Sequence, residues 1–260
     1  IFIGCALLTL GKEVDILIKG FDQCSKLMLK ITDFVMAFSP VGIAALMAKL
    51  VNSISGATVK DVITFIIMDY VAAIVVLVVM YPLLLKLLSG LSPLTFFKKI
   101  TEPMLVAITT TSSAATLPVS LKTAGTKLGI PENVYGFTLP LGNTCGMNGF
   151  AIFIGLCCIF CSNVYGVEIT FSKLVLYVFL GIILSVGAAG VKGAGIVMST
   201  VLLEAIGMPL TVIPIFAAIW PAIDPPHTLL NNVSDIVGTS IIAKRLGLID
   251  ENVYNSEIVD

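Results

Sequence analysis

Residues 224–235, "DPPHTLLNNVSD", concentrate polar side chains in a chain that is 57% hydrophobic. The stretch holds two aspartates, two asparagines and the only histidine of the sequence. If the chain after the two prolines is helical, one helix face carries polar side chains spaced three or four residues apart. These positions are His227 or Thr228, Asn231 and Asp235. Asp224 is then expected to cap this helix, with Pro225 at its first position and a break at 224–226.

The composition around this stretch is that of an integral membrane protein. Only 12% of the residues are charged, whereas soluble domains carry roughly 25%. The mean hydropathy is +1.06, and several apolar runs approach the roughly 20 residues that span a bilayer. The net charge of −1 and the lack of a basic run exclude nucleic acid as a partner. The lipid bilayer is the expected surrounding of the chain.

Four apolar segments are each interrupted by small, hydroxylic or proline residues. A helix near 13–52 and a long apolar helix near 58–89 precede them. The interrupted segments are 94–124, broken within 109–116; 131–162, broken within 142–149; 168–206, broken within 187–195; and 209–246, broken at 224–226. Non-helical backbone at membrane depth needs protein, water or a ligand to satisfy its polar groups. The order of hairpin and then broken helix occurs twice, which indicates the substrate site of a secondary transporter.

The polar stripe favours ligand binding over simple helix packing. Ionisable groups within a bilayer usually face a cavity or a pathway. Asp235 therefore suggests a cation ligand, while Asp224 together with Asn231 suggests a polar organic ligand. The alternative is that the stripe only joins helices through hydrogen bonds.

Two further features leave alternatives open. His227 is either a satisfied core histidine or a group that contacts a ligand or carries a proton. The hydroxyls and free N–H groups around Ser112 and Ser113 suit a carboxylate, although such runs also form plain loops. The six cysteines fit small buried hydrophobic residues better than zinc ligands, because one histidine leaves few partners. No organic cofactor is expected.

Four ordered motifs resemble the dicarboxylate/amino acid:cation symporter family, the glutamate and neutral amino acid transporters. They are "TSSAATLPVS" (111–120), "FTLPLGNTCGMNG" (137–149), "GAAGVKGAG" (187–195) and "DPPHTLLNNVSD" (224–235); "SPVGIAAL" (39–46) extends the similarity over almost the whole chain. The resemblance implies an all-α membrane protein with the glutamate-transporter-like fold. It further implies two re-entrant helical hairpins, broken transmembrane helices in inverted repeats, a homotrimer in the plasma membrane and an elevator mechanism.

The resemblance also implies a division of the chain. Residues 1–52 correspond to the end of a scaffold region with transmembrane segments 4 and 5, and residues 53–260 to a mobile transport domain. Within the transport domain, the implied elements are segment 6 (58–89), hairpin 1 (94–124), segment 7 (131–162), hairpin 2 (168–206) and segment 8 (209–246). Because the chain opens inside an apolar run, the first three segments are expected to be absent.

Substrate positions follow from the resemblance. Ser113 and Asn231 would bind the α-carboxylate of an amino acid, and Asp224 would bind its α-ammonium. The remaining implied substrate positions are Ser112, Phe150, Val191, Gly195, His227 and Thr228.

Two sodium sites are implied as well. Their carbonyl oxygens come from helix breaks, and oxygen donors of this kind suit a hard cation. The first site comprises Gly142, Gly146, Asn231 and Asp235. The second comprises Thr144, Met147, Ser185, Val186 and Ala188.

Three departures from the family pattern bear on the substrate. His227 stands where members with acidic substrates carry an arginine, so the bidentate partner for a side-chain carboxylate is missing. Phe150 replaces a threonine and is expected to reduce the pocket. Asn148 replaces the aspartate of a third sodium site, which implies fewer coupled ions. The prediction is symport of a small neutral amino acid with sodium.

Four alternatives stay open. Two lie within the family: a proton-coupled symporter that uses His227, and a symporter of dicarboxylates or acidic amino acids. A third is a homologue that keeps the fold but no longer transports. The fourth is an intramembrane serine hydrolase built from Ser113, His227 and Asp224. Because hydrolysis has no need for paired helix breaks, enzymatic activity is not expected.

Overall fold

The computed structural model describes residues 2–38, 41–42, 44–45, 56–188 and 194–256, and these residues form helices and short connections without a strand. The chain divides into two compact units, Ile1–Gly42 and Ile43–Asp260. The expected end of the scaffold region at residue 52 and the motif residues 39–40, 43 and 46 lie outside the described residues. That domain boundary therefore stays a prediction.

The first unit is a helical hairpin. It consists of α1 (Phe2–Leu10), the short η1 (Gly11–Val14) and α2 (Asp15–Ala37). Gly11 opens the turn with a φ of 53°, a conformation that suits glycine because it lacks a Cβ. Apolar side chains such as Ile16 and Leu17 are exposed on α2. The helix expected near 13–52 is confirmed as far as Ala37.

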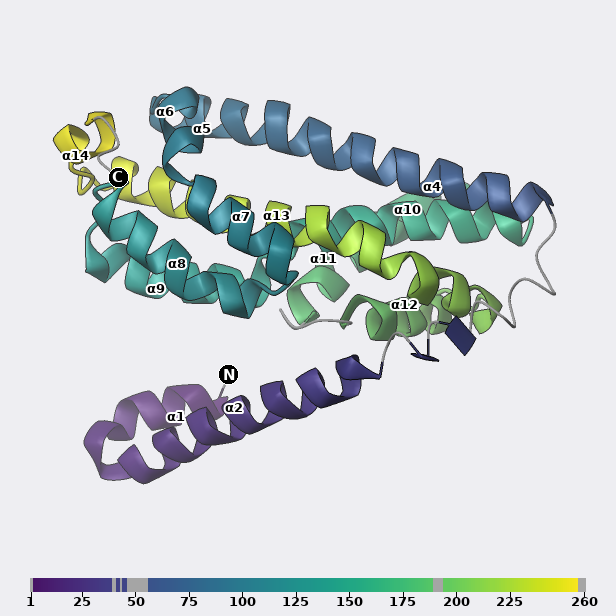
Figure 1. Cartoon of the computed structure of the whole chain (residues 1–260), viewed down its shortest axis with the longest axis horizontal. Helices are drawn as coiled ribbons and strands as arrows, with labels where there is room; N and C mark the ends of the chain where they lie inside the picture. The colour runs from purple at the N-terminus through teal and green to yellow at the C-terminus, as the bar shows by residue number, and fades with distance from the viewer. Residues whose placement is uncertain (1, 39–40, 43, 46–55, 189–193, 257–260) are drawn as a thin grey trace. The chain divides into compact units, whose positions relative to one another are not determined.

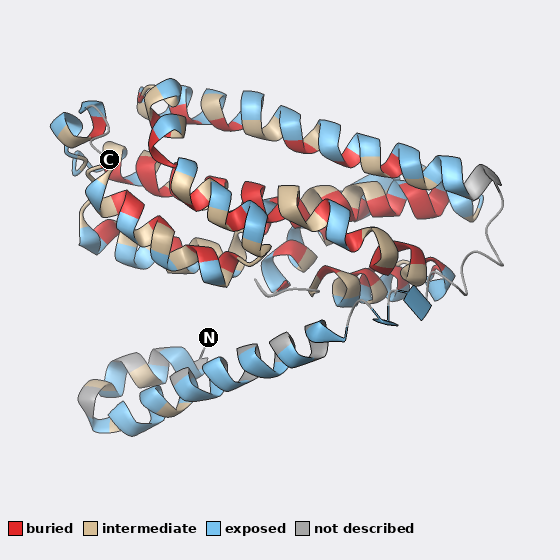
Figure 2. Cartoon of the chain, in the orientation of Figure 1, coloured by how far each residue is buried: buried red, intermediate tan, exposed pale blue. Residues whose placement is uncertain are grey.

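The second unit begins with a long apolar helix. It runs through α4 (Gly56–Val75), the π-helical turn η2 (Val76–Met80) and α5 (Tyr81–Ser89), and it ends at Gly90, whose φ is 74°. Val59–Ser89 and Glu132–Val164 are the two described helical stretches long and apolar enough to cross a membrane. Many aliphatic side chains of α4 are exposed, as Figure 2 shows along its outer face. Exposed apolar surface of this extent suits contact with lipid.

Two of the expected breaks occur in the next two segments. The elements are α6 (Pro93–Lys99), α7 (Thr101–Thr110), α8 (Ser113–Thr126), α9 (Glu132–Cys145) and α10 (Asn148–Val164). Thr111 leaves the helix with a φ of 49°, and the Ser112 hydroxyl then caps α8 by accepting a hydrogen bond from the Ala115 N–H. Gly146 and Met147 separate α9 from α10. The helix interruptions expected within 109–116 and 142–149 are therefore confirmed.

The third break lies between α11 (Phe171–Gly187) and α12 (Ala194–Ala205). Residues 189–193, which include the predicted substrate position Val191, lie outside the described residues. After α12 the chain forms η3 (Leu210–Val212), the long α13 (Ile213–Arg245) and the short α14 (Glu251–Asn255).

The expected break at 224–226 is wrong, because α13 continues through Asp224, Pro225 and Pro226. Asp224 is therefore an interior residue of the helix and not its cap. Pro226 has no N–H to donate to the carbonyl of Ala222. The Tyr70 hydroxyl of α4 donates to that carbonyl instead, at 2.6 Å. A neighbouring helix thus satisfies the acceptor that the proline leaves free, and the helix can continue.

Helix α13 is the centre of the second unit (Figure 1). It contacts α4, α5, α7, α8, α9, α10 and α12. Buried residues concentrate on α13 and α10, where Figure 2 shows most of the buried colour. The polar stretch at residues 224–235 therefore lies in the middle of the packed helices.

Candidate functional site

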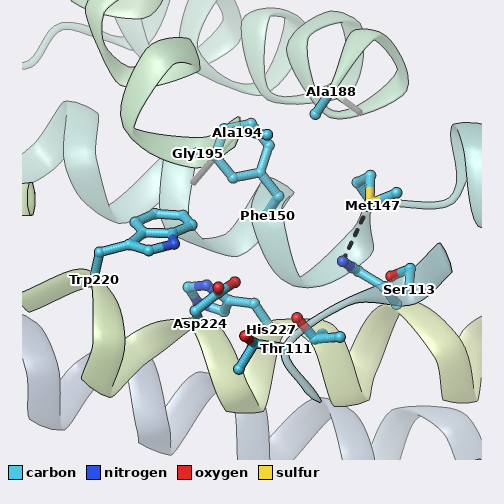
Figure 3. Close-up of a pocket in the computed structure, with 12 residues that line it drawn as sticks. Thr111, Ser113, Met147, Phe150, Ala188, Ala194, Gly195, Trp220, Asp224 and His227 are labelled. Atoms are coloured by element: carbon cyan, nitrogen blue, oxygen red, sulfur yellow. Dashed lines mark hydrogen bonds between the residues drawn. The ribbon is translucent and has the colours of Figure 1, made fainter. Parts of the chain in front are cut away.

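A cavity lies where the helix breaks meet α13 (Figure 3). It is lined by residues of α13, of the α7–α8 and α9–α10 breaks, and of the facing ends of α11 and α12. The lining residues are Thr111, Ser113, Met147, Phe150, Ala188, Ala194, Gly195, Trp220, Asp224, His227, Thr228 and Asn231. Seven of the nine substrate positions expected from the sequence are among them. The other two are Ser112, whose hydroxyl caps α8, and Val191, which lies outside the described residues.

The amide of Asn231 ties the α9–α10 break to α13. Its Oδ1 accepts a hydrogen bond from the Gly149 N–H at 2.7 Å, and its Nδ2 donates to Met147 Sδ at 3.2 Å, drawn in Figure 3. A Cβ added to Gly149 would lie 2.5 Å from the backbone of His227. Only glycine allows α10 to begin this close to α13.

Ser113 is held by a residue that the sequence analysis did not single out. Its hydroxyl accepts a hydrogen bond from Asn232 Nδ2 at 3.2 Å, and the same nitrogen donates to the Thr228 carbonyl at 2.8 Å. Ser113 and Asn232 are both buried. The hydroxyl and the α13 stripe are thus held in fixed positions on two sides of the cavity.

His227 forms a buried pair with an aspartate of α4. The distance from His227 Nε2 to Asp69 Oδ1 is 2.8 Å, and the side chains are 3% and 0% exposed, respectively. His227 Nδ1 and Asp69 Oδ2 have no hydrogen-bond partner among the described residues. Asp69 was not predicted from the sequence, although an aspartate in the middle of a long apolar run is itself a signal of function.

Aromatic rings form the apolar wall of the cavity. The Phe150 and Phe153 rings are stacked with centroids 5.7 Å apart, and the Trp220 ring meets Phe150 edge-on at 6.4 Å. Gly195 leaves the space that the Trp220 indole occupies, since a Cβ there would overlap the ring. Trp220, the only tryptophan of the chain, was also missed.

Three residues of the first expected sodium site, Gly142, Gly146 and Asp235, lie close together. A Cβ added to Gly142 would lie 2.5 Å from Asp235 Oδ1, and one added to Gly146 would also collide with that oxygen. The carboxylate of α13 therefore lies directly against the last turn of α9. A carboxylate beside backbone carbonyls is a donor set that suits a hard cation.

The second expected sodium site is less compact. Met147 and Ala188 both line the cavity. The hydroxyls of Thr144 and Ser185 donate within their own helices, to the carbonyls of Pro140 and Ile182. The Val186 side chain has no donor atom, so only its backbone carbonyl could serve at this position.

The geometry does not support the serine hydrolase alternative. Ser113 Oγ is hydrogen-bonded to Asn232, whereas His227 Nε2 is bonded to Asp69. Among the described residues no hydrogen bond joins the serine to the histidine, as a nucleophile and its base require.

The chain is similar to known proteins over most of its length. The family model described as the sodium:dicarboxylate symporter family matches residues 1–245. The chain is 32% identical over 244 residues to an uncharacterized symporter of Haemophilus influenzae, covering 91% of this chain and 55% of that protein. It is 29% identical to the neutral amino acid transporter B(0) of Mus musculus, covering 93% and 44%. It is 28% identical to the L-cystine uptake protein TcyP of Bacillus thuringiensis, covering 98% and 56%. The chain thus spans about half the length of the curated relatives it matches.

Proposed function

Because the chain belongs to the sodium:dicarboxylate symporter family, a family of transporters and not of enzymes, we propose that it is part of a secondary transporter for a small neutral amino acid. Sodium is the proposed coupled ion. The observation that carries this proposal is the cavity in which the helix breaks converge on the polar side chains of α13. The name of one relative, the neutral amino acid transporter B(0), agrees with a neutral amino acid as the substrate.

The cavity offers complementary groups to an amino acid. The Ser113 hydroxyl and the Asn231 amide would bind the α-carboxylate, and the Asp224 carboxylate would bind the α-ammonium. The described lining residues include no lysine or arginine, so none of them offers a cation to pair with a side-chain carboxylate. Phe150 and Trp220 occupy space that a long side chain would need. These features favour a small zwitterion such as alanine, serine or threonine.

Sodium would bind where Asp235 lies against Gly142 and Gly146. This carboxylate lies one turn from Asn231 on α13, and the Asn231 amide holds Gly149 at the start of α10. Sodium binding at Asp235 would therefore affect the position of the Asn231 amide that binds the substrate. The second proposed sodium position is the region of Met147 and Ala188. Each ion would stabilise the helix breaks against which the substrate rests.

The remaining features of the proposal concern the whole transporter. Segments 94–124 and 168–206 would enter the membrane as re-entrant hairpins, and 53–260 would move as a transport domain against a scaffold that includes 1–52. The inverted repeats, the elevator movement, the homotrimer and the multi-pass location in the plasma membrane belong to this proposal as well.

The test is a thermal-stability screen of the full-length protein in detergent. Alanine, serine, threonine, aspartate and glutamate are each added in sodium chloride or in choline chloride. We expect stabilisation by a neutral amino acid only with sodium; a ligand at about 100 times its Kd stabilises by about 2.7 kcal/mol. Asp235→Asn should lose the sodium-dependent part, because the amide no longer offers a charged ligand.

The matched control is Glu132→Gln, which neutralises an exposed carboxylate at the start of α9 and should behave like the wild type. Equal stabilisation by neutral amino acids in choline and sodium would contradict sodium coupling. If uptake then follows a proton gradient, the buried His227–Asp69 pair makes proton coupling the second candidate.

A further inference from the structure

Asp69 lies behind the cavity wall without lining the cavity. It lies in the middle of α4, 158 residues before His227 in the sequence, and its side chain is fully buried. Its Oδ1 is 2.8 Å from His227 Nε2, while His227 itself lines the cavity. Asp69 is thus one hydrogen bond away from a residue of the cavity wall.

The contacts select one protonation form of that ring. A carboxylate accepts hydrogen bonds, so the Nε2 that faces Asp69 carries a proton and donates it. Among the described residues, His227 Nδ1 has no partner. On a ring protonated at both nitrogens, Nδ1 would be a buried donor without an acceptor, whereas on a singly protonated ring it keeps an unpaired lone pair. The neutral ring with its proton on Nε2 is the form that fits these contacts.

We propose that Asp69 is a positioning residue that determines substrate specificity by holding the proton of His227 on Nε2. His227, which lines the cavity, then keeps an unprotonated Nδ1, so its ring has no second N–H to donate to a ligand. A side-chain carboxylate offers only acceptors, so it would leave lone pairs facing lone pairs. This repulsion disfavours acidic amino acids. A binding site can gain specificity in this way, through a contact that is unfavourable for the competing ligand. The inference rests on the proposed function, because it assumes that the cavity holds an amino acid.

The chain allows a direct measurement of the proton position. His227 is the only histidine in the sequence, so its ring nitrogens give unique signals in nitrogen-15 NMR of the full-length protein in detergent. In the wild type we expect a protonated Nε2 and an unprotonated Nδ1. In Asp69→Asn the amide can donate to Nε2, and the proton should move to Nδ1. An amide in place of an orienting carboxylate has this effect on an imidazole in serine proteases.

Selectivity is measured in the same preparations with alanine and aspartate as probes. Asp69→Asn should raise the affinity for aspartate relative to alanine by about tenfold or more. The unfavourable contact between the side-chain carboxylate of the ligand and the Nδ1 lone pair is removed, and one such polar contact is worth at least that factor. The affinity for alanine itself should change less than about threefold. A structural role alone would weaken both ligands equally and leave their ratio unchanged.

The matched control is Asp61→Asn, which neutralises an exposed carboxylate eight residues earlier on α4 and should change neither the NMR signals nor the affinity ratio. If Asp69→Asn does not fold, Asp69→Leu removes the charge at similar volume and should raise the ratio as well. A protonated Nδ1 in the wild type, or an unchanged ratio in the folded variants, would overturn the proposal. If no amino acid binds at all, the proposed function fails, while the NMR signals still report whether Asp69 holds the proton on Nε2.

Discussion

Phe150 illustrates how one side chain can limit what a cavity accepts. It is 5% exposed, lies in the first turn of α10, and its ring contacts those of Phe153 and Trp220. On one side the ring completes an aromatic cluster, and on the other it lines the cavity. Its removal should therefore affect both stability and the size of ligand that fits.

Phe150→Ala should admit larger neutral amino acids, such as methionine or glutamine, while destabilising the protein by about 3 kcal/mol. Competition binding in detergent measures the first effect, and thermal unfolding measures the second. Phe160→Ala is the matched control, because Phe160 belongs to the same cluster but does not line this cavity. Phe160→Ala should lose stability without admitting larger ligands. Identical ligand profiles for the two variants would contradict the role of Phe150.

At the scale of the element, α13 is a helix that keeps three interior prolines. The carbonyl of Ala222 would be without a donor because Pro226 lacks an N–H, and Tyr70 of α4 supplies one. Pro225 frees the carbonyl of Pro221 in the same way, and Pro221 is exposed at the helix surface. The continuity of α13 thus depends on α4, and the polar stripe depends on that continuity.

Tyr70→Phe should destabilise the protein by about 1 to 3 kcal/mol, the cost of leaving a carbonyl without a partner. The matched control is Tyr81→Phe, which removes the hydrogen bond from the Tyr81 hydroxyl to the Leu230 carbonyl. Leu230 is followed four residues later by Ser234, which has an N–H, so its carbonyl keeps a helical donor. Tyr81→Phe should cost only about 0.5 to 1.5 kcal/mol. Chemical unfolding in detergent compares the two, and a larger loss in Tyr81→Phe would argue against this account.

At the scale of the whole second unit, α14 joins the ends of several helices. Lys99 of α6 is 3% exposed, and its amine donates to the carbonyls of Lys127 and Val253. The Tyr254 hydroxyl donates to the Ser92 carbonyl at 2.9 Å, next to α6. A segment close to the end of the described chain is thereby attached to the connection after α8.

Lys99→Met should loosen this attachment while preserving most of the side-chain volume. Hydrogen bonds from a charged group contribute about 1.5 to 3 kcal/mol, so hydrogen exchange in α14 should accelerate markedly. Lys98→Met is the control, because Lys98 is exposed and should leave exchange unchanged. Equal exchange rates in both variants would show that Lys99 does not hold α14.

The sequence predicted the breaks in three segments because glycine, serine and threonine at those points weaken helices through local backbone preferences. It also predicted which polar residues of α13 share a face, since that follows from helical periodicity alone. It was wrong about the prolines at 225–226, because whether a proline ends a helix depends on a donor from elsewhere. Asp69 was missed because no motif surrounds it and its partner, His227, lies 158 residues later in the chain.

The sequence by itself thus determined that the chain is a helical membrane protein. It also determined where most of the helices break and which residues form the polar stripe of the last long helix. These properties depend on neighbours within a few turns. Only the tertiary structure decided that α13 runs unbroken past its prolines and that His227 pairs with Asp69. Both depend on a partner more than 150 residues away in the chain, Tyr70 in one case and Asp69 in the other. Local propensity cannot specify such a partner; helix packing does.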